Sequence, residues 1–157
     1  MRRRRPEKRK VLPDPLFGDI VVTKFINNLM LDGKKSIAER IFYKSIKLVE
    51  NKTKNTNGLE VFKKALQNVS PSLEVKSKRI GGATYQVPME IAPNRKSALA
   101  MRWIISFSKS RKGNTMADRL ADELIAASKN EGSSVKKKEE THRMAEANKA
   151  FAHFGRL

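Results

Sequence analysis

The stretch KSKRIGGATYQVPMEI, residues 76–91, decides how the rest of the chain is interpreted. Its second half alternates polar residues with Tyr85, Val87 and Met89, and paired glycines stand at positions 81 and 82. Alternating residues on both sides of a glycine pair are typical of a β-hairpin. The sequence therefore predicts a hairpin at about residues 73–90, with Lys76, Lys78 and Arg79 crowding its first strand.

Two loop lengths are compatible with this hairpin. A two-residue turn at residues 81–82 places Val75 opposite Pro88 and Lys76 opposite Val87, which mixes polar and apolar side chains on each face. A three-residue loop at residues 80–82 places Val75 opposite Val87. Because one face of a hairpin is normally buried, matching of the faces favours the three-residue loop.

Apolar residues elsewhere recur at helical spacing, so the fold class is mainly α. Asp19 is expected to cap a first helix that ends at Gly33, and Ser36 with Glu39 forms a capping-box pattern for a second. A polar loop at residues 51–58 precedes a third helix, which begins at Asn57. The sequence thus predicts a bundle of about six helices with one protruding β-hairpin.

The last three predicted helices follow the hairpin. Pro93 suits the first turn of a helix with Leu99, Trp103 and Phe107 on its expected buried stripe and with Ala98, Met101 and Ile105 nearby. Thr115 is expected to cap the next helix. Residues 135–154 have good helix formers but few apolar residues, so this last helix is expected to be solvent-exposed or to lie on another molecule.

The charge balance is the strongest global feature of the chain. Among its 157 residues, 34 basic and 16 acidic side chains give a net charge of +18. Such a surplus repels itself, and a polyanion such as nucleic acid would relieve the repulsion. An anionic membrane is the second choice, although no apolar run approaches the roughly 20 residues of a membrane-spanning helix.

Residues 1–17 are interpreted as a basic N-terminal arm, and residues 18–157 as a single helical domain. The first ten residues, MRRRRPEKRK, contain seven basic side chains and no apolar periodicity. Four consecutive arginines favour an arm that becomes ordered on phosphates, and a disordered solubilising tail is the alternative.

The sequence offers little for catalysis or for cofactor binding. It has no cysteine, and its two histidines, His142 and His153, are eleven residues apart, which is not a zinc-site spacing. No nucleotide-binding glycine motif or nucleophile motif occurs, so no enzyme, metal, cofactor or small-molecule substrate is predicted. Tyr85 fits packing at the root of the hairpin better than stacking on a base.

Five blocks carry a resemblance to a known family: LPDPLFGD (12–19), DGKKSIAERIFY (32–43), EVKSKRIGGATYQVPMEI (74–91), ALAMRWII (98–105) and HRMAEANKAFAHF (142–154). They closely resemble the bacterial-type small-subunit ribosomal protein seven family, over about residues 11–154. The resemblance implies a helical bundle with a protruding hairpin. It also implies a structural role, with binding to the 3′ major domain of 16S rRNA and nucleation of head assembly in the small subunit.

By the same resemblance, the protein would lie near the E-site tRNA and the mRNA exit path, beside ribosomal protein eleven. It would be cytoplasmic, within the ribosome, and a plastid ribosome stays open. The residues expected to bind rRNA are Arg2, Arg3, Arg4, Arg5, Lys8, Arg9, Lys10, Lys34, Lys35, Lys76, Lys78, Arg95, Lys96, Arg102, Lys109, Arg111 and Lys112. Those expected near tRNA or mRNA are Arg79, Gly81, Gly82, Lys136, Lys137, Lys138 and Arg143.

Two other classes of function compete with this interpretation. A general basic nucleic-acid-binding protein that compacts DNA would bind duplex DNA as well as structured rRNA at equal salt concentration. An RNA-modifying enzyme would need a cofactor loop or an acid–base pair, and neither is visible in the sequence.

Overall fold

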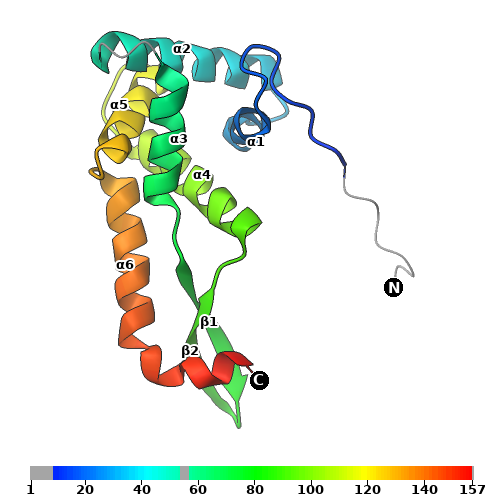
Figure 1. Ribbon diagram of the computed structural model, residues 1–157, viewed down its shortest axis with the longest axis vertical. Helices are drawn as coiled ribbons and strands as arrows, with labels where there is room; N and C mark the ends of the chain where they lie inside the picture. The colour runs from blue at the N-terminus through cyan, green and yellow to red at the C-terminus, as the bar shows by residue number, and fades with distance from the viewer. Residues whose placement is uncertain (1–8, 54–56, 157) are drawn as a thin grey trace. The chain divides into compact units, whose positions relative to one another are not determined.

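The computed structural model describes residues 9–53 and 57–156, so the predicted contacts of Arg2 to Arg5 and Lys8 lie outside the described residues. The described chain forms two compact units, the first ending at Arg40 and the second beginning at Ile41. The hairpin and the helices that follow it all belong to the second unit (Figure 1). The arm boundary predicted at residue 17 stays a prediction.

The first unit contains α1 (Ile20–Leu29) and the first turn of α2 (Lys35–Thr53). Asp19 caps α1 as predicted, since its carboxylate accepts a hydrogen bond from the Val21 N–H at 2.8 Å. The helix ends earlier than predicted. Its last residue is Leu29, and Gly33 lies in the following turn with φ of 71°.

The predicted capping box at the start of α2 is wrong. Ser36 lies inside the first turn of this helix, whose first residue is Lys35. The carbonyl of Lys34 already accepts a hydrogen bond from the Ala38 N–H at 3.3 Å, so helical hydrogen bonding starts before Ser36. At its other end α2 extends to Thr53, into the segment predicted as a loop.

The second unit is built on α3 (Gly58–Val69), α4 (Pro93–Ser110) and α5 (Met116–Ser128), where α3 and α4 both pack against α5. Phe42 of α2 meets Phe62 of α3 edge to face, with ring centroids 5.2 Å apart, and both rings are fully buried. Edge-to-face aromatic pairs contribute about 0.5–1.5 kcal/mol beyond the burial of their area. The predicted caps Asn57 and Thr115 are both confirmed.

The buried face of α4 differs from the predicted stripe. Leu99 is buried as expected, but Trp103 and Phe107 are only half-buried. Met101 and Ile105, which the sequence placed near this stripe, are buried, and Ile104 and Ser108 are buried with them. These residues also follow helical spacing, and the sequence alone does not say which of two adjacent apolar faces meets α3 and α5.

The hairpin consists of β1 (Leu73–Ile80) and β2 (Ala83–Glu90), paired antiparallel. The predicted three-residue loop is wrong, because Ile80 pairs with Ala83 and leaves a two-residue turn. Gly81 and Gly82 have φ of 57° and 90°, the positive values that a type I′ turn requires at both central positions. The twist of this turn matches that of the strands, and here this outweighs matching of the faces.

Val75 therefore lies opposite Pro88, and Lys76 lies opposite Val87. One row of the hairpin combines lysines from β1 with apolar side chains from β2. Such a mixed row needs a cover from elsewhere in the chain.

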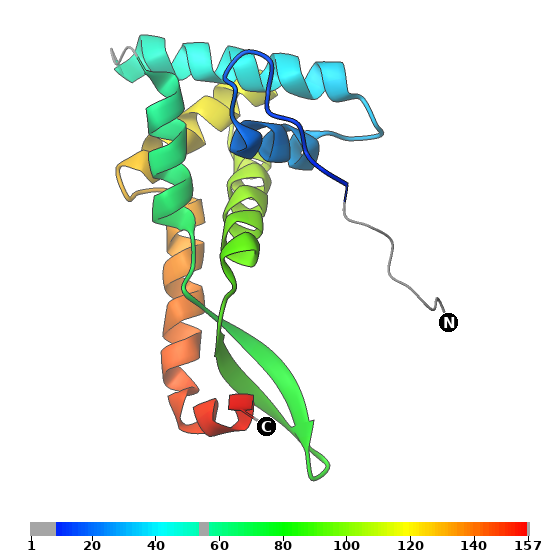
Figure 2. The same cartoon turned by 45° about the vertical axis from the view of Figure 1, so that its right-hand side comes forward.

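The C-terminal part of the chain supplies this cover. The single helix predicted over residues 135–154 is divided into α6 (Ser133–Ala147) and the 3₁₀ helix η1 (Lys149–Arg156). Figure 1 and Figure 2 show α6 running beside the hairpin and η1 crossing it, and η1 packs against β2. Although α6 is very polar, it packs within the protein and buries Val135, Thr141 and Ala145.

Candidate nucleic-acid interface

The cations of the hairpin differ in how they are used. Lys78 Nζ donates a hydrogen bond to the Phe154 carbonyl of η1 at 2.9 Å, and Lys76 Nζ lies 3.6 Å from Glu74 Oε1. Arg79, next to the turn, is exposed and makes no ion pair or side-chain hydrogen bond with any described residue. The turn glycines, Gly81 and Gly82, are also exposed. The tip of the hairpin therefore presents one free guanidinium to a partner.

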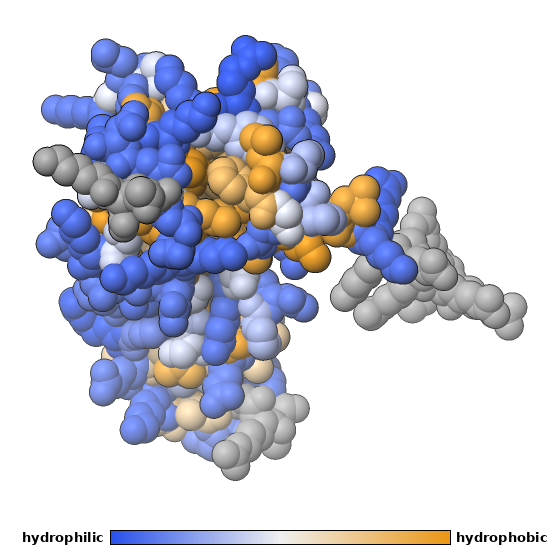
Figure 3. Space-filling model, turned by 45° about the horizontal axis from the view of Figure 1, so that its top comes forward, coloured by the Kyte–Doolittle hydropathy of each residue, from blue (hydrophilic) through white to orange (hydrophobic). Residues whose placement is uncertain are grey.

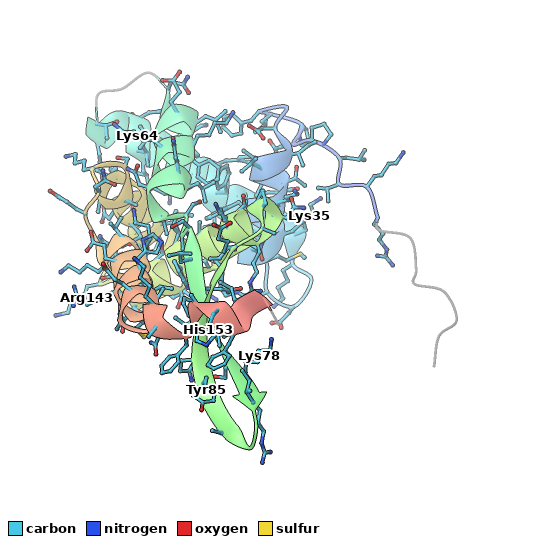
Figure 4. All side chains as sticks on the ribbon, turned by 60° about the horizontal axis from the view of Figure 1, so that its bottom comes forward. Lys35, Lys64, Lys78, Tyr85, Arg143 and His153 are labelled. Atoms are coloured by element: carbon cyan, nitrogen blue, oxygen red, sulfur yellow. The ribbon has the colours of Figure 1, made fainter. Side chains whose placement is uncertain are left out.

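Tyr85 packs on the C-terminal segment rather than at the root of the hairpin. Its ring centroid lies 5.3 Å from that of Phe151 and 5.1 Å from that of Phe154. Figure 4 shows η1, which carries His153, crossing the hairpin near Lys78 and Tyr85. The aromatic ring is thus used for packing, as predicted, but the packing surface comes from residues far away in the sequence.

At the root of the hairpin, Arg95 of α4 binds Glu74 of β1 through both carboxylate oxygens. Arg95 Nε donates to the two oxygens at 2.8 and 2.9 Å, and Nη2 donates to Oε2 at 2.8 Å. The hydrogen bonds from Arg95 lower the pKa of Glu74, and the nearby charges of Arg95 and Lys76 lower it further, against the opposing effect of burial. Arg95, predicted to bind rRNA, is therefore engaged within the protein.

The other predicted cations of α4 and the loop after it divide in the same way. Arg111 donates from Nε to Glu123 Oε2 at 2.5 Å, and Glu123 is 1% exposed. Arg102, Lys109 and Lys112 are exposed, and Lys96 is half-buried. Within the described residues these last four side chains have no hydrogen-bonding or ionic partner, so they stay available to phosphates.

On α6, two of the four predicted cations are free. Lys137 pairs with Glu140 at 2.7 Å, and Lys138 Nζ donates to the Asn68 carbonyl at 2.6 Å. Lys136 and Arg143 are exposed and line a shallow groove beside Phe107 of α4. Neither makes an ion pair or a side-chain hydrogen bond in the part of the chain that the structure describes.

The first unit carries its own basic residues. Arg9, Lys10 and Lys35 line a groove over α1, with Asp14 and Glu39 also on its wall. Lys35 Nζ lies 3.9 Å from Glu39 Oε1, so this pair is loose, and Lys34 is exposed. The four cations are solvent-exposed, which keeps them accessible to an anionic partner.

Sequence reasoning missed several residues that matter here. Glu123 stands three residues after Leu120 on the buried stripe of α5, and an acid at a core position is a signal that a cation must meet it. Arg119 also escaped notice, because its contact with the Lys109 carbonyl spans two helices. Exposed lysines on α2 and α3, among them Lys44, Lys47 and Lys64, add to the positive surface. No pattern separates such lysines from ordinary solvated ones.

Three further properties of the described residues concern hydropathy, metal ligands and long apolar helices. Hydrophilic side chains cover most of the face that Figure 3 presents. The described residues contain no group of three or more His, Asp or Glu side chains placed to hold a metal ion. Across the same residues, no helix is both long enough and apolar enough to cross a membrane.

Comparison with known proteins gives a consistent result over nearly the whole chain. A family model described as "Ribosomal protein S7p/S5e" matches residues 1–149. The small ribosomal subunit protein uS7 of Cytophaga hutchinsonii is 60% identical over 154 residues, covering 98% of this chain and 99% of that protein. The proteins of the same name from Nitratiruptor sp. and Caulobacter sp. (strain K31) are 57% and 56% identical, each covering 98% of this chain and 99% and 98% of their own length.

Proposed function

The chain belongs to the ribosomal protein S7p/S5e family, and from this premise we propose that it anchors the 3′ major domain of 16S rRNA. Members of this family are structural, non-enzymatic components of the ribosome, and the protein is accordingly a constituent of the small ribosomal subunit that binds rRNA. The finer proposal is that binding nucleates assembly of the head. It rests on the family resemblance and on the exposed cations described above.

The observation that carries this proposal is the division between engaged and free cations. Arg95, Arg111 and Lys138 bind groups within the protein. Arg102, Lys109, Lys112 and Lys136 belong to the same unit and are exposed and unpaired among the described residues. Lysine and arginine at such positions neutralise phosphates and release counterions, which favours binding to structured RNA without requiring base contacts.

The hairpin has a separate role in this proposal. Its free tip, with Arg79 beside the turn, would reach the E-site tRNA and the mRNA exit path, and the C-terminal segment would lie beside ribosomal protein eleven. In the cell the protein would act in the cytoplasm, or in a plastid, as part of the ribosome. The exposed guanidinium at the tip supports this role because it is not used for internal packing.

The test is a binding series with a transcript of the 16S rRNA 3′ major domain and, in parallel, duplex DNA of equal charge. If about eight phosphates are neutralised, the slope of log K against log salt concentration is near −7. We expect a preference for the rRNA of about a thousandfold that survives physiological salt. Equal affinities for both ligands that decrease in parallel as salt increases would instead favour a general basic nucleic-acid-binding protein.

A point variant tests the role of the hairpin tip separately from rRNA binding by the rest of the protein. Deleting residues 77–84 would also remove Lys78, which donates to the Phe154 carbonyl of η1 and is the strand partner of Tyr85, so it would disturb two elements at once. Arg79→Gln leaves those contacts in place. We expect it to leave rRNA binding unchanged and to reduce E-site tRNA occupancy in reconstituted subunits. A loss of rRNA binding would mean that the tip belongs to the rRNA-binding surface.

A further inference from the structure

The loop after α4 carries three cations that look equivalent in the sequence. Lys109 lies in the last turn of α4, which ends at Ser110, and Arg111 and Lys112 follow the helix directly. The structure shows that they are not equivalent, because two internal anchors hold this loop and each uses an arginine.

The first anchor is the pair of Arg111 and Glu123. Glu123 is almost fully buried, and its second oxygen, Oε1, accepts hydrogen bonds from the backbone N–H of Ser134 at 3.0 Å and from the Ser134 hydroxyl. Glu123 thereby caps α6, whose own N-cap residue, Gly132, offers no side chain. Arg111 supplies the charge that a buried carboxylate needs, so its departure would leave that carboxylate unpaired.

Gly132 makes room for this anchor. It has φ of 93°, and a Cβ at this position would lie 3.2 Å from Glu123 Oε1 and 3.6 Å from Arg111 Nη2. The backbone therefore closes over the ion pair from the side of α6. This enclosure opposes exchange of the Arg111 side chain between Glu123 and an outside anion.

The second anchor is Arg119 of α5. Its Nη1 donates to the Lys109 carbonyl at 3.0 Å, which satisfies a carbonyl at the C-terminal end of α4. Gly113 packs on the stem of the same side chain, since a Cβ there would come within 2.8 Å of Arg119 Cγ. The loop is thus fixed near its start by Arg119 and in its middle by Arg111.

Lys109 and Lys112 are left outside these anchors. Both are exposed and, in the described part of the chain, neither side chain has a partner. We propose that residues 109–113 form a preformed RNA phosphate-binding loop in which Lys109 and Lys112 contact phosphates. Arg111 and Arg119 are positioning residues, which act through Glu123 and through the Lys109 carbonyl. This inference rests on the proposed function for its RNA ligand.

The proposal predicts whether one substitution, Glu123→Gln, strengthens or weakens RNA binding. Removing a negative charge from a protein of net charge +18 ordinarily strengthens RNA binding or leaves it unchanged. Glu123→Gln instead releases the Arg111 anchor, so the loop and the start of α6 become less ordered. We expect this variant to bind RNA roughly tenfold more weakly, because lysines that must be ordered on binding contribute less net affinity.

The matched control is Glu131→Gln, which removes an exposed acid from the segment between α5 and α6. It should bind RNA as well as the wild type or slightly better. The probes are the 3′ major domain transcript and an unrelated structured RNA of equal length, each measured across a salt series. Circular dichroism and thermal melts of every variant report whether the helices remain folded.

The salt slope distinguishes contact residues from positioning residues. Lys112→Gln should reduce the slope by about 0.7–0.9, the value for one lost phosphate contact. Arg111→Lys should weaken binding with an unchanged slope, because lysine keeps the charge but lacks the Nε–H that donates to Glu123 Oε2. This variant also decides the question if Glu123→Gln fails to fold.

Two results would overturn the proposal. One is stronger RNA binding by Glu123→Gln than by Glu131→Gln, which would mean that the freed Arg111 contacts phosphates itself. The other is full retention of affinity by Arg111→Lys. If the wild type shows no preference for the rRNA transcript, the proposed function fails. Affinities and salt slopes measured with both RNAs still show whether Arg111 positions the loop.

Discussion

His142 lies where α6 meets the start of the hairpin, and its Nε2 accepts a hydrogen bond from the Ser72 N–H at 3.0 Å. An accepting Nε2 requires the neutral ring. Partial burial lowers the pKa of His142, and the positive charge of Lys138 lowers it further. Protonation would remove the acceptor and place a like charge beside Lys138, so this residue makes the junction between α6 and β1 sensitive to acid.

The sign of the pH dependence follows from the lowered pKa of His142. Below its ordinary value of about 6.5, the unfolded state binds the proton more readily than the folded state. The stability contributed by neutral His142 is therefore present above pH 6.5 and is lost as pH falls through the lowered folded pKa. We expect His142→Gln to reduce the loss of stability between about pH 7 and pH 5, measured by chemical denaturation.

The control for this prediction is His153→Gln, since His153 is exposed and outside the junction. Carboxylates also titrate toward pH 5, so the informative quantity is the difference between each variant and the wild type at the two pH values. Identical pH profiles for the wild type and His142→Gln would show that the Ser72 hydrogen bond does not couple protonation to folding.

Caps show how single residues set element boundaries. The Thr115 hydroxyl accepts from the Asp118 N–H at 3.2 Å and donates to the Asp118 carboxylate at 2.5 Å, a bond that is the main cause of the lowered pKa of Asp118. We expect Thr115→Ala to cost about 1 kcal/mol in the free energy of unfolding. Equilibrium denaturation checks this value, with Thr84→Ala on the exposed part of the hairpin as control. A cost equal to that of the control would mean that the cap contributes nothing.

Among the elements, the hairpin depends most on its neighbours. A two-stranded ribbon is marginally stable in water by itself. Here η1 covers its mixed row through the rings of Phe151 and Phe154 on Tyr85 and through the hydrogen bond from Lys78. The helical core of α3, α4 and α5 does not take part in these contacts. The stability of the hairpin and the stability of this helical core should therefore respond separately to substitution.

This separation can be measured by hydrogen exchange. We expect Phe151→Ala with Phe154→Ala to speed amide exchange in β1 and β2, because aromatic pairs of this kind contribute about 0.5–1.5 kcal/mol each. Amides of α3 and α5 should keep their protection. Ala150→Ser, at an exposed position of η1, is the control. Equal exchange in the hairpins of both variants would show that the ribbon is held by α6 alone.

At the scale of the whole molecule, the net charge of +18 acts on folding and on binding in opposite directions. Salt screens the repulsion among the lysines and arginines of the free protein, and it also weakens their attraction to phosphates. We expect the melting temperature of the free protein to rise as salt increases from low to moderate concentration, by about 2–4 °C for each kcal/mol of repulsion removed. RNA affinity should fall over the same range.

Thermal melts and binding measurements on one set of buffers test this expectation. A protein with a balanced charge of similar size serves as the control for general salt effects on stability. A melting temperature that falls with salt would mean that the ion pairs, such as Arg95 with Glu74 and Lys52 with Asp122, outweigh the repulsion.

The sequence by itself determined the helical class, the hairpin between two helices, most of the caps and the polyanionic character of the partner. These features depend on local patterns, namely apolar spacing, a glycine pair and capping residues, or on a sum of charges that no fold alters. The family was also readable from contiguous blocks of residues. Each of these properties is carried by neighbours in the chain, so folding was not needed to reveal it.

Only the tertiary structure decided which cations are free. Arg95 and Lys96 are adjacent, yet Arg95 binds Glu74 while Lys96 has no partner among the described residues. The same holds for Arg111 and Lys112, because Glu123 reaches only the first. The break before η1 was likewise decided by packing, whereas the length of the hairpin turn follows from the local twist of the two-glycine turn. An ion pair depends on distances between elements, and the order of residues along the chain does not contain those distances.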